Sequence, residues 1–157
     1  MAKIILGLDP GIADTGYGVI SCEKGKLTCL TYGSIKTSPK QNLLERLEEL
    51  DSQLKTIINK YQPELIAVEQ LFFNKNVKTA LIVGQARGII LLRIKKSGAK
   101  FFEFTPGQIK QAVTAYGKAS KNQVQKMVKI ILSLKELPQP DDAADALAIA
   151  ICSSNLK

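Results

Sequence analysis

The order in which strand-like and helix-like patterns follow one another is the strongest constraint on how this chain folds. An apolar run at residues 3–9 stops at Asp9-Pro10-Gly11 and predicts a buried strand. Residues 15–22 and 27–37 are rich in Thr, Tyr, Val and Ile, and a polar turn at residues 23–26 separates them. We therefore expect the first three strands to form an antiparallel meander.

Helical patterns alternate with strands in the rest of the chain. Apolar residues spaced by three and four predict a helix that ends before Gln62-Pro63, and Ser38-Pro39 predicts its start. Strands are expected at residues 65–69 and 100–104, with a helix from about 76 to 96 between them, and further helices at 105–114, after Ser120 and at 141–153. This order predicts an α/β fold, a mixed five-stranded sheet flanked by helices, in a single domain spanning residues 1–157.

The helix expected at residues 76–96 carries Ala80, Gly84 and Gly88 at four-residue spacing. Glycine costs about 1 kcal/mol relative to alanine inside a helix, so two glycines call for a reason. Two interpretations remain open. Either the helix packs tightly on its own sheet, or it forms the interface of a dimer.

The net charge of +8 is concentrated in one part of the sequence. Residues 74–135 contain 13 basic residues and one acid, Glu103. Such a block indicates a polyanionic partner. Because almost all of the basic residues are lysines, we expect contacts to phosphates more than readout of base edges.

Composition excludes several classes of protein. The chain has no histidine, which removes mechanisms with an imidazole base and zinc sites with histidine ligands. Its longest apolar run, residues 146–152, is too short to span a membrane, so no membrane partner is expected. Three scattered cysteines without a C-x-x-C motif indicate free thiols and a cytoplasmic location.

Four acids stand where a metal site would need them. Asp9 ends the first predicted strand and Glu69 ends the fourth, so both project from one sheet edge if the two strands are neighbours. Asp142 and Asp145 are three residues apart and share one helical face. Asp141, four residues before Asp145, could share that face, but it is also the expected N-cap of the helix. Converging carboxylates are tolerable when divalent cations neutralise them, and carboxylates with open water positions suit Mg²⁺ or Mn²⁺.

Seven ordered blocks of sequence resemble the RuvC-type Holliday junction resolvases. They are IILGLDPG at 4–11, TGYGVI at 15–20, Glu69-Gln70 with Phe72, GQARG at 84–88, QIKQ at 108–111, Lys121 with QVQ at 123–125, and DAADALAIA at 142–150. The resemblance covers nearly the whole chain. It implies an RNase H-like fold, a homodimer, and metal-dependent symmetric nicking of four-way DNA junctions in recombination and repair.

The resemblance also assigns roles to individual residues. It implies Asp9, Glu69, Asp142 and Asp145 as catalytic ligands of two Mg²⁺ ions per site, with Mn²⁺ as a substitute, giving 5′-phosphate and 3′-hydroxyl ends. Lys110 and Lys121 match lysines near the scissile phosphate, and Phe72 matches an aromatic residue that stacks on bases at the junction centre. It further implies RuvA and RuvB as partners in branch migration.

Other DNA contacts are predicted from charge or from the matching blocks. Lys75 and Lys118 are expected at phosphates, and Arg87 is placed among the DNA-binding residues. Each lysine has a simpler interpretation as a solvated surface charge, and the pair Phe72-Phe73 has one as part of the core.

Three other functions remain as alternatives. The turn at residues 8–11 with the following Thr-Gly hairpin also resembles the phosphate-binding turn of actin-like ATPases and sugar kinases, but those enzymes need two such domains. A junction-binding module without activity would leave its four acids idle. A related RNase H-like nuclease acting on another structured nucleic acid is the main alternative.

Overall fold

A mixed sheet forms the centre of the protein. The computed structural model describes residues 1–70 and 77–156, and in this part of the chain five strands lie in the order β3-β2-β1-β4-β5. They are β1 (Lys3–Asp9), β2 (Asp14–Glu23), β3 (Lys26–Lys36), β4 (Leu65–Glu69) and β5 (Lys100–Phe104). β1, β2 and β3 form the expected antiparallel meander, and β4 joins β1 and β5 in parallel. The predicted mixed five-stranded sheet is therefore confirmed.

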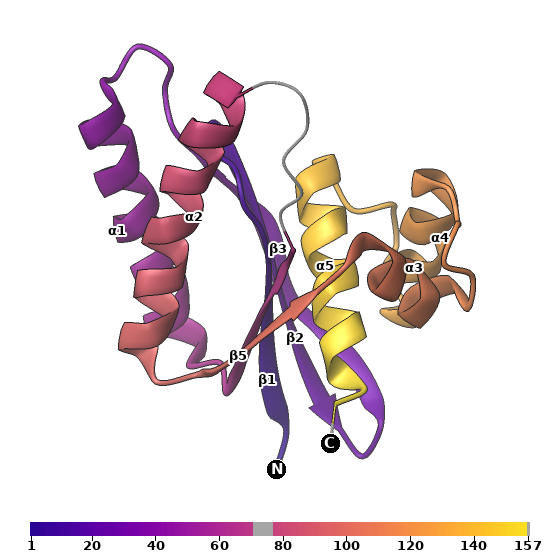
Figure 1. Ribbon diagram of the computed structural model, residues 1–157. Helices are drawn as coiled ribbons and strands as arrows, with labels where there is room; N and C mark the ends of the chain where they lie inside the picture. Colours follow the sequence, from indigo (N-terminus) through magenta and orange to yellow (C-terminus); the bar gives the residue numbers. More distant parts are fainter. Residues whose placement is uncertain (71–76, 157) are drawn as a thin grey trace.

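Helices cover both faces of the sheet (Figure 1). α1 (Leu43–Tyr61) and α2 (Val77–Ser97) lie on one face, and α3 (Pro106–Thr114), α4 (Lys121–Ile131) and α5 (Asp141–Ser154) lie on the other. β4 alternates between the two cores: Leu65 and Ala67 point to the α5 side, Ile66 and Val68 to the α1 and α2 side. A strand that is buried on both faces has a continuous run of apolar residues in its sequence, and β4 has such a run at residues 65–68. In the described part of the chain, no helix has the length and apolarity needed to cross a membrane.

One predicted helix start and one predicted N-cap are wrong. α1 begins at Leu43, because Asn42 and Glu45 form a reciprocal capping box, while Ser38 and Gln41 close a separate turn before it. In α5 the N-cap position belongs to Pro140, so Asp141 lies in the first turn and does not cap the helix. In both cases the N-cap is a residue other than the predicted one: Asn42 in place of Ser38, and Pro140 in place of Asp141.

The glycines of α2 do not pack against the sheet. Among the described residues, a Cβ atom added at Gly84 or Gly88 would meet nothing within 4 Å. The interpretation of tight packing inside the chain is therefore wrong. The glycines lie on a helix that also exposes Val77, Leu81 and Leu92.

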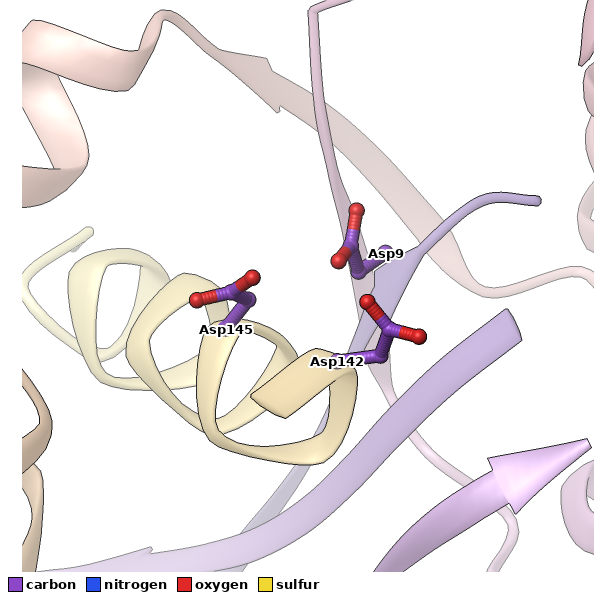
Figure 2. Close-up of side chains that lie close together, drawn as sticks. All are labelled: Asp9, Asp142 and Asp145. Atoms are coloured by element: carbon purple, nitrogen blue, oxygen red, sulfur yellow. The ribbon is translucent and has the colours of Figure 1, made fainter. Parts of the chain in front are cut away.

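Glycines elsewhere let α5 lie directly on the sheet. A Cβ at Gly7 would lie 2.1 Å from the carbonyl oxygen of Ala146, and one at Gly16 would lie 1.9 Å from that of Asp142. Real Cβ atoms do not come so close, so only glycine admits the helix at these points. As a result the first turns of α5 lie beside the end of β1 that carries Asp9 (Figure 2).

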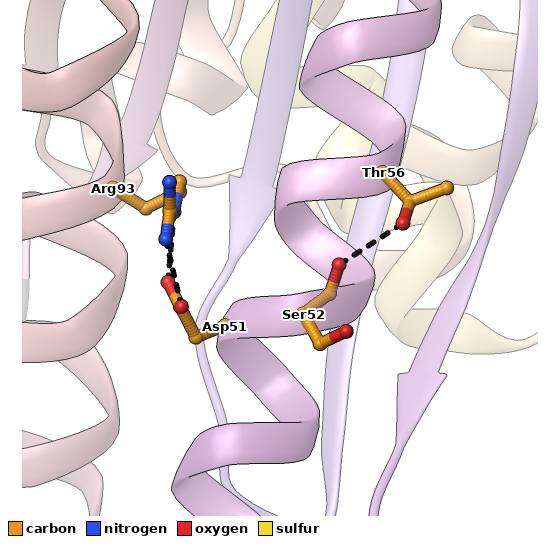
Figure 3. Close-up of polar contacts among 4 residues, drawn as sticks. All are labelled: Asp51, Ser52, Thr56 and Arg93. Carbon is orange, nitrogen blue, oxygen red and sulfur yellow. Dashed lines mark hydrogen bonds and ion pairs between the residues drawn. The ribbon is translucent and has the colours of Figure 1, made fainter.

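An arginine joins the two helices on the opposite face. Arg93 of α2 donates from Nε to Oδ1 of Asp51 in α1 at 2.8 Å and from Nη2 to Oδ2 at 2.7 Å, beside a local bond from the Thr56 hydroxyl to the Ser52 carbonyl (Figure 3). The hydrogen bond from Arg93 lowers the pKa of Asp51. The Asp51 side chain is 36% exposed, so solvent screens the pair.

We predict that this pair contributes modestly to stability. In a double-mutant cycle with Asp51→Ala and Arg93→Ala, we expect a coupling of about 0.5–1 kcal/mol in the free energy of unfolding, measured with urea at pH 7. Because the folded pKa of Asp51 lies below its ordinary 3.8, the contribution is complete above that pH and is lost as acid protonates the carboxyl. Additive single-mutant effects would contradict the prediction.

Candidate active site

Three aspartates meet at one edge of the sheet. Asp9 ends β1, and Glu69 ends β4, the parallel neighbour in which Val68 pairs with Leu8. The first two turns of α5 bring Asp142 and Asp145 to the same edge, and one carboxylate oxygen from each of Asp9, Asp142 and Asp145 lies within 4.8 Å of the others (Figure 2). The expectation that β1 and β4 are neighbours is therefore confirmed.

Glu69 lies outside the 4.8 Å group but is coupled to it through charge. Burial, followed by the charge of Asp145, raises the pKa of Glu69, and Lys110 and Lys121 oppose the shift. Its charge in turn raises the pKa of Asp9. The fourth predicted acid thus faces the same small volume from the side of β4.

The clustered carboxylates destabilise one another in their charged forms. Burial and the charges of Asp145, Asp142 and Glu69 raise the pKa of Asp9 to about 8. Burial also raises the pKa of Asp145, although Lys121 opposes it. Carboxylates that share a desolvated site favour a proton or a cation, and hard oxygen donors suit Mg²⁺ or Mn²⁺. The donor set therefore fits a divalent cation.

Two lysines stand beside the acids. Lys121, at the start of α4, places Nζ 3.5 Å from Asp145 and 3.6 Å from Asp141. It lines one hollow together with Lys110 of α3, Glu69 and Asp145, over an apolar floor that includes Ile109 and Val124. A phosphate entering this hollow would meet both ammonium groups next to the carboxylates.

The remaining predicted DNA contacts are distributed differently. Lys118 is exposed in the loop before α4. Phe72, Phe73 and Lys75 lie outside the described residues, so their predicted roles stay predictions.

Arg87 has partners inside the protein. Its Nη1 donates to the backbone carbonyl of Glu69 at 2.9 Å, and its Nη2 lies 2.9 Å from a carboxylate oxygen of Glu103 in β5. The side chain is 12% exposed and lines a second hollow with Asp9 and Glu69. Sequence reasoning placed Arg87 at DNA and missed this arrangement, although Glu103, as the one acid in a basic segment, was a signal for a specific partner.

Asp141, which the sequence analysis did not include among the site acids, also has partners near the site. It contacts Lys121 and accepts a hydrogen bond from the Gln125 side chain at 3.2 Å. Asp141 therefore helps to hold the lysine near the site, although it is absent from the group of three aspartates.

Comparisons with known proteins agree along almost the whole chain. The sequence model of the family described as crossover junction endodeoxyribonuclease RuvC matches residues 5–153. A protein of that name from Halothermothrix orenii is 54% identical over 97% of this chain and 92% of its own length. Another from Desulforamulus reducens is 56% identical over 95% and 91%.

Solved structures give the same result. The Thermus thermophilus RuvC structure has a TM-score of 0.88 and 38% identity, covering 96% of this chain and 92% of its own. The same organism's RuvC in complex with a Holliday junction substrate has a TM-score of 0.87 and 35% identity, with the same coverage. The yeast mitochondrial Holliday junction resolvase Ydc2, at 16% identity and a TM-score of 0.68, shares the fold.

Proposed function

The chain belongs to the RuvC family of crossover junction endodeoxyribonucleases, and we propose that it resolves four-way DNA junctions by paired symmetric nicks. The observation that carries the proposal is the convergence of Asp9, Asp142 and Asp145 within 4.8 Å, with Glu69 facing them. The basic block at residues 74–135, which includes Lys110 and Lys121 beside the acids, supplies the attraction for DNA. We propose that residues 1–157 act as one RNase H-like nuclease domain.

The four acids would hold two Mg²⁺ ions, with Mn²⁺ as a substitute. When bound, the ions lower the pKa of water and neutralise charge on the leaving oxygen. Asp9 lies centrally, since the other three acids all raise its pKa, and it is therefore the carboxylate best placed to serve both ions. Lys110 and Lys121 hold the scissile phosphate and offset the charge that develops on it. Hydrolysis leaves 5′-phosphate and 3′-hydroxyl ends.

The experiment compares a synthetic four-way junction with a linear duplex of the same sequence. We expect paired nicks on the junction alone, lost in EDTA, which removes the ions, and in Asp145→Asn, which removes one of the carboxylates that would hold them. A panel of flaps and RNA–DNA hybrids tests the alternative of another structure-specific nuclease. Tight binding of the junction without cleavage in Mg²⁺ or Mn²⁺ would overturn the catalytic assignment.

We further propose that the enzyme is a homodimer joined through α2. No atom of residues 1–70 or 77–156 would contact a Cβ at Gly84 or Gly88 on this face of α2, and Leu81 is 63% exposed. Small residues on a helix allow close approach of a second helix, and a second copy would cover this apolar surface. Two sites related by a two-fold axis would then face opposite strands of the junction.

We predict that Leu81→Glu raises the dissociation constant of the dimer by at least about 10-fold, because a buried carboxylate at the interface has no partner. Light scattering coupled to gel filtration measures it. Leu44→Glu is the matched control, since Leu44 is 79% exposed on α1. An equal effect of both variants, or of neither, would argue against an interface on α2.

Partners and location follow from family membership and the cysteines. A RuvA and RuvB branch-migration complex is the proposed partner. The three cysteines, Cys22, Cys29 and Cys152, are free thiols, in keeping with the cytoplasm as the proposed location.

A further inference from the structure

One arginine connects the candidate dimer helix to the backbone of a site residue. Arg87 reaches from α2 to the end of β4, where Nη1 donates to the Glu69 carbonyl, and its other nitrogen, Nη2, meets Glu103 of β5. Both distances are 2.9 Å. The rigid guanidinium fork fixes both partners at once, and a lysine in its place offers a point charge without that geometry.

The contact lies where the last pairs of the sheet form. Glu69 pairs with Phe104 at the end of the β4–β5 ladder, and the next amide, of Gln70, donates to the Phe104 carbonyl at 2.8 Å. The Glu69 carbonyl is held by Arg87 from the side of α2. The peptide plane of Glu69 is therefore fixed from two elements, and the direction of its side chain follows from that plane.

The position of Glu69 matters because its carboxylate must reach the three aspartates. Glu69 is not in the 4.8 Å group, so the site depends on a strand end that is correctly oriented. Arg87 lines the same hollow as Asp9 and Glu69 and is 12% exposed. Its two terminal nitrogens each have an acceptor within the protein, which leaves little of the side chain for a phosphate.

We propose that Arg87 is a positioning residue that orients Glu69 for divalent-cation binding, and that Glu103 holds Arg87 in place. The inference rests on the proposed function, because it assumes that Glu69 helps to hold the ions. Groups that hold a metal ligand in place typically change metal affinity by about 10–100-fold when they are replaced. The effect reaches the site through the backbone, and Arg87 itself touches neither the cation nor the DNA.

The test measures Mn²⁺ binding to the full-length protein by calorimetry, without DNA. For Arg87→Lys we expect the dissociation constant to rise by about 10-fold. Arg93→Lys is the matched control: Arg93 lies on the same helix, is 16% exposed and is ion-paired, but its partner Asp51 is in α1 and away from the site. We expect its Mn²⁺ affinity to stay within about 2-fold of the wild type.

Glu103→Gln provides a second variant in case Arg87→Lys folds poorly. It keeps the bond to the Glu69 carbonyl possible and removes only the charge partner, so we expect Mn²⁺ affinity to weaken by about 3-fold. Junction binding in EDTA is measured on all variants and is expected to match the wild type.

The outcomes separate the two proposals. Wild-type protein that binds no Mn²⁺ contradicts the proposed function itself. Wild-type binding that is unchanged in folded Arg87→Lys and Glu103→Gln overturns the positioning role alone. Unchanged Mn²⁺ affinity together with weaker junction binding in EDTA would instead make Arg87 a DNA contact.

Discussion

Asp9→Asn abolishes nicking and, at the same time, stabilises the metal-free protein at alkaline pH: this is the expected result with the largest effect. Asp9 belongs to the group of three aspartates and is coupled by charge to Glu69 as well, and the amide removes the negative charge that would hold the ions. Losing several kcal/mol of stabilisation in the transition state corresponds to a fall in the cleavage rate by a factor on the order of 10³ or more. Single-turnover cleavage of a labelled four-way junction measures this loss.

The gain in stability follows from the direction of the pKa shift. The pKa of Asp9 rises from 3.8 to about 8 on folding, so the contribution of this carboxyl to the free energy of unfolding is fully present below pH 3.8, declines as the pH rises from there, and is lost once the pH passes about 8. Asparagine has no proton to lose at this position, so its contribution to the free energy of unfolding does not change with pH. Removing an uncompensated buried charge is worth about 1–3 kcal/mol, which corresponds to roughly 2–10 °C in Tm for a chain of this size.

Calorimetry in EDTA at pH 5 and pH 9 measures this difference. We expect the gap in Tm between Asp9→Asn and wild type to widen from pH 5 to pH 9, and Mg²⁺ to narrow it by stabilising the wild type. Asp14→Asn is the matched control. Asp14 accepts a hydrogen bond from Ser34, which an asparagine oxygen also accepts, and it lies outside the three-aspartate group. A gap that does not change with pH would show that Asp9 is not under electrostatic strain.

Much of the fold was predictable from the sequence because its elements end at strong local signals. β1 stops at Asp9-Pro10-Gly11 and β5 at Thr105-Pro106, and both strands have the predicted bounds. The placement of Asp9 and Glu69 at one edge was predictable because parallel neighbours bring their carboxyl ends to the same side of the sheet, and β1 and β4 are such neighbours.

What the sequence did not reveal depends on contacts between distant elements. α1 starts later than predicted because Ser38 and Asn42, four residues apart, both offer a capping signal. The reciprocal capping box at Asn42 is the stronger of the two. The internal bonds of Arg87 required the third dimension, since Glu69 and Glu103 are far from it in sequence. Spacing alone also did not show which glycines face a neighbouring backbone and which face open space.

Gly16 is the glycine whose replacement should affect the site most. A Cβ at this position would lie 1.9 Å from the carbonyl oxygen of Asp142 and 2.3 Å from its carbonyl carbon. Both are backbone atoms at the start of α5, so the helix itself must move. We expect Gly16→Ala to lower the free energy of unfolding by about 2–4 kcal/mol.

The same displacement should reach the chemistry. Moving a catalytic group by about 1 Å costs on the order of 10²-fold in rate, and α5 carries two of the four acids. Gly7→Ala provides a comparison, because its Cβ would press on Ala146 and Ala150 further along α5, at 2.1 and 2.8 Å. We expect it to lower both stability and nicking by amounts similar to those of Gly16→Ala, because Ala146 follows Asp145 directly and Gly7 lies two residues before Asp9.

Gly107→Ala is the control that makes this comparison decisive. Gly107 lies in α3, is exposed, and its Cβ would meet only the Thr105 hydroxyl at 4.0 Å, so the substitution should be neutral or slightly stabilising. Urea unfolding and single-turnover nicking below the unfolding transition measure all three variants. If Gly16→Ala proves as stable and as active as Gly107→Ala, then α5 does not rest on β2 as closely as the structure has it, and the placement of Asp142 beside Asp9 would have to be reconsidered.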